Sequence, residues 1–252
     1  MRTAEWTDSI SVLDRLTAIF DAFEGAEEGL GVSELARRAN LPKSTVSRIA
    51  ADLVTQRLLD REDDRLYLGV RLFELGQTVQ QPRRLRRLAL PIMTELRNLT
   101  GATVQLAVPE GPDVVVVAVV RGRPGDAPLP RAGSRLPAHA TALGKALLAH
   151  QVAGVDETPG PREQLTPHTI VEPGALRREL NEVRRTGFAV EREECAIGRI
   201  GLASAVPDAA GVAVAAVGLA ASAGDLDPDR VAPALRATAM RLAHRIAAAR
   251  AD

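Results

Sequence analysis

The residues best suited to chemistry lie together in the stretch LPKSTVSRI at 41–49. At helical spacing Val46 and Ile49 face inward, which leaves the hydroxyl groups and two cations on the opposite side. Serine and threonine bond phosphate oxygens or base edges, and lysine and arginine favour phosphate oxygens or guanine. The chemistry indicated is recognition of double-stranded DNA. The candidate contacts are Lys43, Ser44, Thr45, Ser47 and Arg48.

Lysine itself is rare in this chain. Of the 32 basic residues only Lys43 and Lys145 are lysine, a bias toward arginine that is typical of a G+C-rich genome. A lysine then persists mainly where the protein retains it. Lys145 falls about one turn into an alanine-rich helix predicted over 140–150, which opens near Thr141. Its side chain could either face a pocket or cap a neighbouring element.

The segments around 41–49 are those that would position a DNA-reading helix. Apolar periodicity predicts three helices in succession, and Pro42 fits the first position of the third, where a missing N–H costs nothing. Two short strands then predict a β-hairpin. This order is typical of a winged helix-turn-helix, whose third helix enters the major groove. The expected helices are 10–23, 34–39 capped by Ser33, and 43–56, and the expected strands are 58–62 and 65–69.

The charge of this region is modest. Residues 33–71 hold eight basic and six acidic residues, so non-specific affinity for DNA should be low and specific contacts must carry much of the energy. Arg61 and Arg65, in the predicted hairpin, are expected to contact phosphates. The low charge leaves open an alternative, a protein-interaction module whose helix-turn-helix does not touch DNA.

From residue 103 onward the hydrophobic pattern becomes strand-like. Apolar runs separated by turn residues predict an antiparallel sheet, and helical segments between them predict helices packed against it. The second half is therefore predicted to be an α+β domain, with irregular stretches at 122–137 and 151–169. The expected strands are 103–108, 113–120, 188–192, 200–206 and 212–220, and the expected helices are 140–150, 175–186 ending at Gly187, and one beginning at Asp227 and Pro228.

Composition narrows the class of protein. At 252 residues, length allows one large or two modest domains, and 46% hydrophobic residues suffice for a real core. A single cysteine, Cys195, rules out an intramolecular disulfide and suits a reducing compartment. The N-terminal residues MRTAEWTDSI contain no apolar signal core, and no apolar run approaches the ~18 residues of a membrane span. A cytoplasmic protein without membrane association is expected.

Motifs of catalysis are missing. Cys195 stands beside glutamates, which raise a thiol pKa, and no histidine is adjacent in sequence. The four histidines lack ligand spacing, and there is no phosphate-binding glycine loop. We therefore expect no catalytic residue, no metal and no cofactor. An enzyme with an accessory helical domain is the less favoured alternative, because it would need a nucleophile or acid–base pair that the sequence does not offer.

Several motifs, in their order and spacing, resemble those of the IclR-type transcriptional regulators. The resemblance covers nearly the whole chain, and both lysines lie inside the motifs where the family pattern has lysine. The segments that carry it are SELARRANLPKSTVSRIAADL at 33–53, LYLGVRLFELG at 66–76, LPAHATALGKALLA at 136–149, GFAVEREECAIG at 187–198 and PDAAGVAVAAVGL at 207–219.

The resemblance implies an architecture and partners. It implies a winged helix-turn-helix DNA-binding domain over 1–70, a linking helix over 71–84, and an effector-binding domain with a GAF-like fold over 85–252. It also implies homodimers, or dimers of dimers, on palindromic or repeated operators. The rival classes then become an interaction module and an enzyme on a GAF-like scaffold.

The resemblance further implies an effector pocket formed by the start of the HATALGKA helix, an acidic residue and small groups on the later strands. Glycine and alanine stand where relatives often carry cysteine or serine, so we expect a roomier, more apolar pocket. A helix N-terminus suits a carboxylate, which predicts an organic acid with an apolar or aromatic body. The alternative is that these small residues only pack sheet against helix. The predicted residues are His139, Ala140, Thr141, Ala142, Leu143, Gly144, Glu191, Gly201, Gly218 and Ala220.

Overall fold

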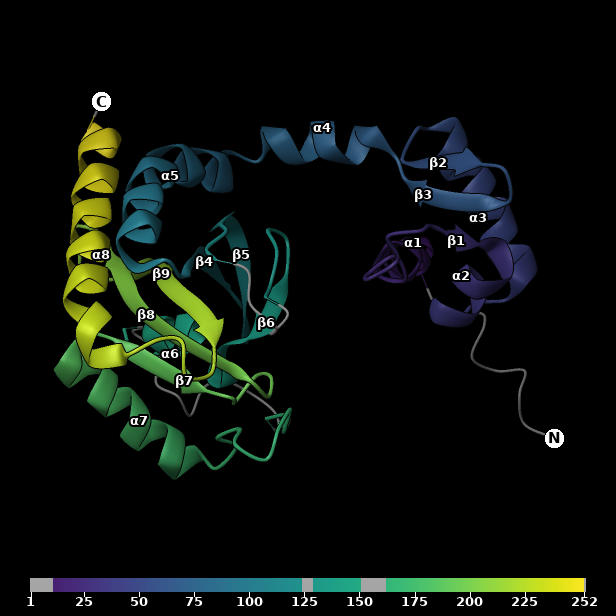
Figure 1. The fold of residues 1–252 in the computed structure, drawn as a ribbon. Coiled ribbons are helices and arrows are strands. Elements are labelled where there is room, and N and C mark those ends of the chain that lie inside the picture. Colours follow the sequence, from purple (N-terminus) through teal and green to yellow (C-terminus); the bar gives the residue numbers. More distant parts are fainter. Residues whose placement is uncertain (1–10, 124–128, 151–161, 252) are drawn as a thin grey trace. The chain divides into compact units, whose positions relative to one another are not determined.

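The computed structural model describes residues 11–123, 129–150 and 162–251 (Figure 1). Parts of the two stretches predicted to be irregular, 124–128 and 151–161, lie outside these residues. The chain divides after Gln80 into two compact units, each with its own hydrophobic core.

The N-terminal unit is a winged helix-turn-helix. Its core is closed by side chains from α1 to α3 and from the three strands, among them Ile19, Leu35, Val46 and Leu66, which are fully buried. Three strands pair antiparallel in the order β1-β3-β2. The elements are α1 (Val12–Asp21), β1 (Leu30–Gly31), α2 (Val32–Arg38), α3 (Lys43–Thr55), β2 (Leu59–Glu62) and β3 (Arg65–Leu68).

Local signals explain the boundaries of these helices. Ser11 and Asp14 form a reciprocal capping box that starts α1. The turn between α2 and α3 is sharp because Asn40 adopts a positive φ of 52°, which asparagine tolerates better than most residues. Pro42 is the cap of α3 and not its first residue. The prediction of Ser33 as a cap is wrong, because α2 begins two residues earlier than predicted, at Val32, with Gly31 as its cap.

Two consecutive helices follow the wing. Helix α4 (Val70–Thr78) ends at Val79, whose backbone is extended, and α5 (Gln80–Thr100) begins directly after it. No residue of α4 is buried. In the C-terminal unit, α5 buries Ala89, Ile92, Met93 and Leu96 along one face.

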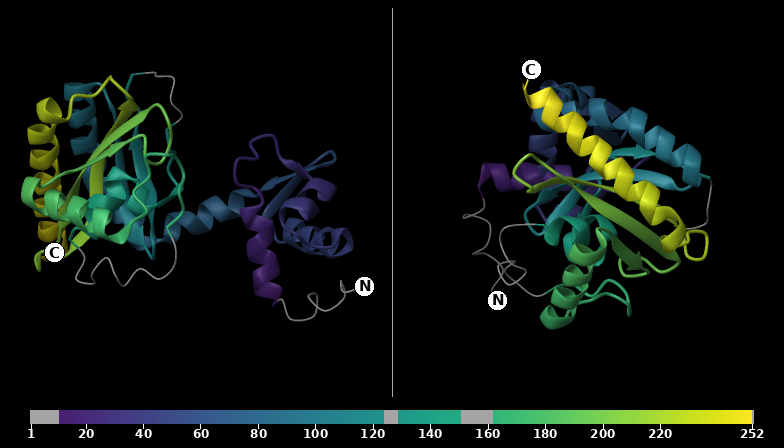
Figure 2. Two further views of the ribbon diagram at one scale, coloured as in Figure 1. Left: turned by 90° about the horizontal axis from the view of Figure 1, so that it is seen from below. Right: turned by 90° about the vertical axis from the view of Figure 1, so that its left-hand side faces the viewer.

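The C-terminal unit is an antiparallel sheet covered by helices on both faces (Figure 2). The predicted strands are confirmed, and the sheet also gains a short edge strand, β6, that pairs with β5. Its order is β6-β5-β4-β9-β8-β7. The strands are β4 (Thr103–Glu110), β5 (Asp113–Val120), β6 (Arg135–Pro137), β7 (Ala189–Arg192), β8 (Arg199–Pro207) and β9 (Ala213–Ser222).

Alternation along the strands divides the core into two layers. One layer holds Leu106 and Leu219 with residues of α5 and α8 (Pro228–Ala251). The other holds Ala107 and Ala216 with residues of α6 (Ala142–Leu148) and α7 (Pro173–Thr186). Because successive side chains of a strand point to opposite faces, the small residues of β8 and β9 lie under α6. The second layer is where the predicted effector residues gather.

Candidate functional site

Helix α3 presents a polar face with no internal partner. Lys43, Ser44, Ser47 and Arg48 are exposed and Thr45 is half-buried, whereas Val46 on the other side is fully buried. Within the described part of the chain, none of the five polar side chains makes a hydrogen bond or an ion pair. The structure thus brings all five predicted DNA contacts onto one surface, and the buried side of α3 fixes the direction in which they point.

The two wing arginines differ from each other. Arg61 is exposed, and no other described residue pairs with it. Arg65 is also exposed, but its Nη1 donates to the backbone carbonyls of Glu28 and Gly29, both at 3.1 Å. Arg65 therefore ties the wing to the turn before β1. This role was not visible in the sequence, because β1 is only two residues long and was not predicted.

Part of the positive charge around α3 is already neutralised. Glu34 accepts hydrogen bonds from Arg37 and Arg38, and these two guanidinium groups lower its pKa to about 2. Arg38 also donates to the carbonyl of Ala22. The charges of Arg37 and Arg38 are therefore partly neutralised by Glu34, whereas Lys43, Arg48 and Arg61 have no ion-pair partner among the described residues.

Lys145 is buried and doubly paired. Its side chain has no exposed surface, and its Nζ lies 2.7 Å from Glu194 Oε1 and 3.1 Å from Glu179 Oε1. The sequence left open whether Lys145 faces a pocket or caps a neighbouring element; in the structure its Nζ bonds two side-chain carboxylates. Lys145 joins α6 to α7 and to the loop after β7.

That loop, residues 193–198, is held from a second side. Thr166 Oγ1 donates to the carbonyl of Glu193 at 2.7 Å, and Thr169 Oγ1 donates to that of Glu194 at 2.6 Å. Burial raises the pKa of Glu194, and the nearby Lys145 opposes this rise. The loop is therefore fixed by buried polar contacts, and among the described residues only Glu194 Oε2 in this loop is buried without a hydrogen-bond partner.

A small cavity lies between the start of α6 and the strands of the sheet. Its volume of about 20 Å³ suffices for roughly one water molecule. Glu191 is buried at its edge and accepts a hydrogen bond from the Cys195 N–H at 3.2 Å. Burial raises the pKa of Glu191, and the charge of Arg199 opposes this rise. The predicted residues that line the cavity are Thr141, Ala142, Leu143, Glu191, Gly201 and Ala220.

The other four predicted residues do not line the cavity. The ring Nε2 of His139 lies 3.0 Å from the Glu163 carbonyl oxygen, and Ala140 is fully buried. A Cβ at Gly144 would come within 2.2 Å of the Ala138 backbone, so glycine lets α6 approach the preceding turn (Ala138–Ala140).

The expectation of a roomier pocket is not met in this structure. A Cβ at Gly218 would lie 2.7 Å from the Leu202 carbonyl oxygen, so this glycine serves close packing and adds no open volume. At Gly201 a Cβ would lie 3.0 Å from Glu191 Oε2. Both contacts agree with the alternative in which small residues pack the sheet against α6.

The sequence reasoning missed a charged residue of the cavity. Arg199 lines it and is only 5% exposed, and its Nη2 lies 3.5 Å from both carboxylate oxygens of Glu191. Gln105 lines the cavity from β4. A signal for Arg199 was present: it is the one charged residue in the run RIGLASAV at 199–206, at a position that shares a sheet face with Gly201.

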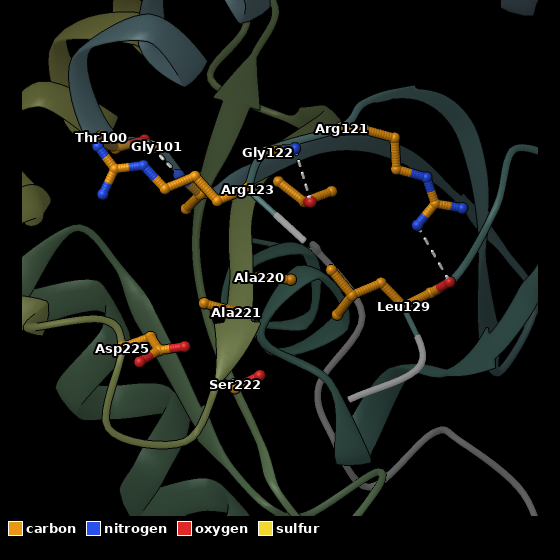
Figure 3. A pocket seen from close by; sticks show the side chains of 12 residues that line it. Thr100, Gly101, Arg121, Gly122, Arg123, Leu129, Ala220, Ala221, Ser222 and Asp225 are labelled. Carbon is orange, nitrogen blue, oxygen red and sulfur yellow. Dashed lines mark hydrogen bonds between the residues drawn. The ribbon is translucent and has the colours of Figure 1, made fainter. Parts of the chain in front are cut away.

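A larger pocket adjoins the cavity. It has a volume of about 510 Å³ and shares Ala220 with the small cavity. Figure 3 shows Arg121 and Arg123 on one side of it and Asp225 on the other. The guanidinium group of Arg121 donates to the Leu129 carbonyl at 3.5 Å. The pocket is therefore rimmed by charge, whereas the small cavity holds a single buried ion pair.

Two family models match consecutive parts of this chain. The IclR helix-turn-helix domain matches residues 12–63, and the domain described as bacterial transcriptional regulator IclR C-terminal matches residues 77–246. The chain belongs to the IclR family. It is thus a transcriptional regulator, with a DNA-binding helix-turn-helix and a C-terminal effector domain, and not an enzyme.

Relatives within the IclR family agree with this assignment. The transcriptional repressor AllR of Klebsiella pneumoniae is 32% identical over 227 residues, which cover 86% of this chain and 82% of AllR. An IclR homologue from Microbacterium hydrocarbonoxydans, solved with 4-hydroxybenzoate, is 29% identical with a TM-score of 0.84 and covers 96% of this chain and 100% of its own. Thermotoga maritima IclR is 25% identical with a TM-score of 0.74, covering 93% and 99%.

Among the described residues no helix is both long enough and apolar enough to cross a membrane.

Proposed function

We propose that this IclR-family regulator binds operator DNA through α3 and the wing, and that a small organic acid in the effector domain changes that binding. The regulated genes are proposed to form a catabolic operon. The observation that carries the DNA-binding part is the row of polar side chains on α3, exposed and without partners among the described residues.

The proposed DNA contacts divide into two kinds. Lys43, Ser44, Thr45, Ser47 and Arg48 enter the major groove, where an arginine bonded to guanine contributes most to sequence discrimination. Arg61 contacts phosphate, and Arg65 does so only to the extent that its bonds to the Glu28 and Gly29 carbonyls allow.

The proposed effector is a small organic acid with an apolar or aromatic body. An aromatic acid, 4-hydroxybenzoate, is bound by the Microbacterium hydrocarbonoxydans relative. A cavity of about 20 Å³ is too small for such a molecule, so binding must move the side chains that fill it. That requirement suits a sensor, because a ligand shifts a conformational equilibrium only by binding one state better than the other.

We further propose a homodimer, or a dimer of dimers, on palindromic or repeated sites. Helix α4 supports this, because Val70, Phe73, Leu75 and Val79 on it or at its end are at least half exposed. Apolar side chains concentrated on one short helix are typical of an interaction surface. A second copy of the chain is the proposed occupant.

A gel-shift on the intergenic DNA upstream of the gene tests the proposal. We expect a specific, salt-sensitive shift that one member of a panel of aromatic and aliphatic acids releases or strengthens. Size-exclusion chromatography with light scattering reports the mass of the free protein. A folded protein that gives no specific shift on any upstream or flanking segment at moderate salt would favour the interaction-module alternative.

A further inference from the structure

Arg199 is a buried cation at the small cavity. Only 5% of the residue is exposed, and it opens β8 on the face that lies under α6. Removing a guanidinium from water costs several kcal/mol unless a partner compensates. A charge in this position, at the edge of a cavity, is therefore a candidate for ligand recognition as well as for structure.

The carboxylate partner of Arg199, Glu191, is not an optimal one; the Cys195 side chain also contacts the guanidinium. Both hydrogen bonds to Glu191 come from the same atom, Nη2, and both are 3.5 Å long. An arginine and a carboxylate at their best form two parallel bonds of about 2.7–2.9 Å. Glu191 also accepts the N–H of Cys195. The Glu191 carboxylate thus accepts a hydrogen bond from the backbone of the loop after β7 and makes only long hydrogen bonds to the Arg199 guanidinium.

Small residues keep the space beside this pair free of long side chains. Gly201 has no side chain, and the position of its absent Cβ lies 3.0 Å from Glu191 Oε2 and 3.5 Å from the Cβ of Ala142. A larger residue at 201 would stand between the ion pair and the start of α6. The glycine therefore leaves the pair reachable from the cavity.

The N-terminus of α6 is a weaker binding site for a carboxylate than its sequence indicates. Thr141 Oγ1 already accepts the N–H of Gly144, and the helix is only seven residues long. The dipole of so short a helix is small, and one of its free N–H groups is used. A full positive charge at Arg199 is the stronger attraction for an anion.

We propose that Arg199 selects carboxylate effectors by exchanging Glu191 for the ligand's carboxylate as its hydrogen-bonding partner. The inference rests on the proposed function, because it places the acid sensed by this regulator in the small cavity. The body of the acid then lies along Leu143 and extends toward Ala220, which the cavity shares with the larger pocket.

The test compares acids with their amides on the full-length protein. Benzoate, phenylacetate and pyruvate are each titrated against the corresponding amide by isothermal calorimetry, with the wild type and with Arg199→Gln. We expect the wild type to prefer at least one acid over its amide by about 10- to 100-fold, the range for a charge-assisted hydrogen bond. Arg199→Gln should lose that preference, and Arg199→Lys should retain part of it.

Matched variants separate recognition from folding. Arg192→Gln removes an exposed arginine of the same hairpin and should leave the preference unchanged. Thermal unfolding and operator binding check that Arg199→Gln is folded. If that variant does not fold, the affinity of Glu191→Gln for the acid tests the proposal instead, because removing the competing carboxylate should tighten acid binding several-fold. Weaker acid binding by Glu191→Gln would overturn the exchange.

Other outcomes overturn the inference in distinguishable ways. A folded Arg199→Gln protein that still prefers the acid removes Arg199 and leaves the proposed function intact. Loss of the preference in the double variant Arg121→Ala, Arg123→Ala instead moves carboxylate recognition to the larger pocket. A wild type that binds no acid better than its amide contradicts both the inference and the proposed effector class, while the operator gel-shift still tests DNA binding separately.

Discussion

The two lysines of the molecule occupy opposite environments. Lys43 stands exposed at the first position of α3, and no described residue pairs with it. Lys145 is wholly buried and bonded to Glu194 and Glu179. Both lie in motifs shared with one family, so the sequence alone treats them alike.

The difference follows from the cost of burying charge. An exposed ammonium group is stabilised by water and remains available to a phosphate, whereas a buried one persists only if carboxylates compensate it. The surface lysine therefore fits the proposed DNA contact, and the interior lysine stabilises the fold through its ion pairs. Arg48 and Arg199 differ in the same way. Arg48 is exposed, whereas Arg199 is buried and makes only long hydrogen bonds to the carboxylate of Glu191.

The largest expected effect comes from removing the buried lysine. Lys145→Ala leaves Glu194 and Glu179 without their cation, and breaking a buried pair costs about 3–5 kcal/mol. The free energy of unfolding of the effector domain should fall by about that amount in a urea titration. Lys43→Ala serves as the control, because exposed substitutions usually change stability by less than ~0.5 kcal/mol. Equal stability of the two variants would show that the ion pairs of Lys145 do not stabilise the effector domain.

The next largest effect concerns the DNA-facing side of α3. Arg48→Ala should weaken operator binding by about 1–3 kcal/mol if the arginine bonds a base, and its loss should relax specificity at one position. Fluorescence anisotropy on operator variants measures both quantities. Unfolding should be unaffected, since Arg48 has no partner in the described structure. A full-strength footprint with this variant would remove Arg48 from the interface.

The two wing arginines, Arg61 and Arg65, are expected to differ in the same way, one contacting DNA and the other stabilising the fold. Arg65→Ala removes two hydrogen bonds to backbone carbonyls, which should lower the stability of the N-terminal unit by about 1 kcal/mol. Arg61→Ala should instead leave stability unchanged and reduce the salt dependence of DNA binding by about one phosphate contact. Thermal unfolding and a salt titration of both variants separate these roles. The reverse result would mean that Arg65 is the phosphate contact.

The smallest effect is a pH dependence of opposite sign in the two units. Because burial raises the pKa of Glu194, its folded form holds a proton more tightly, and its contribution to stability falls as pH rises from 4.5 through the raised pKa. Glu34, with a pKa of about 2, contributes stability above pH 4.5 that is lost as pH falls toward 2.

Urea titrations at stepped pH measure both slopes. Glu194→Gln should flatten the slope of the effector domain, and Glu34→Gln should flatten that of the N-terminal unit. Identical slopes in wild type and Glu194→Gln would show that this carboxyl does not titrate between the folded and unfolded states in the tested range.

Most of the fold could be predicted because its signals are local. Residues close together in the sequence determine the apolar spacing of α3, on which Val46 and Ala50 are buried. They also determine the hairpin turn at Asp63, whose φ is 51°. The same holds for Gly187, which ends α7 with a positive φ. The polar face of α3 follows directly from the helix, so its five residues were found together.

The effector side was harder because its contacts join distant segments. Lys145 meets Glu194 across 49 positions, and nothing near either residue identifies the partner. The prediction that Gly218 adds volume is wrong. The space for its side chain is taken by the carbonyl oxygen of Leu202, which lies on the paired strand β8 and is distant from Gly218 in the sequence. Arg199 was missed for a similar reason, since its burial depends on α6 covering the sheet.

The proposed roles of the two units are tested most directly with the double variant Lys43→Ala, Arg48→Ala, which is titrated with operator DNA and, separately, with the effector acid. We expect wild-type unfolding and wild-type affinity for the effector acid, with the specific operator complex lost. A double variant that still protects the operator fully would show that the exposed face of α3 does not read the DNA.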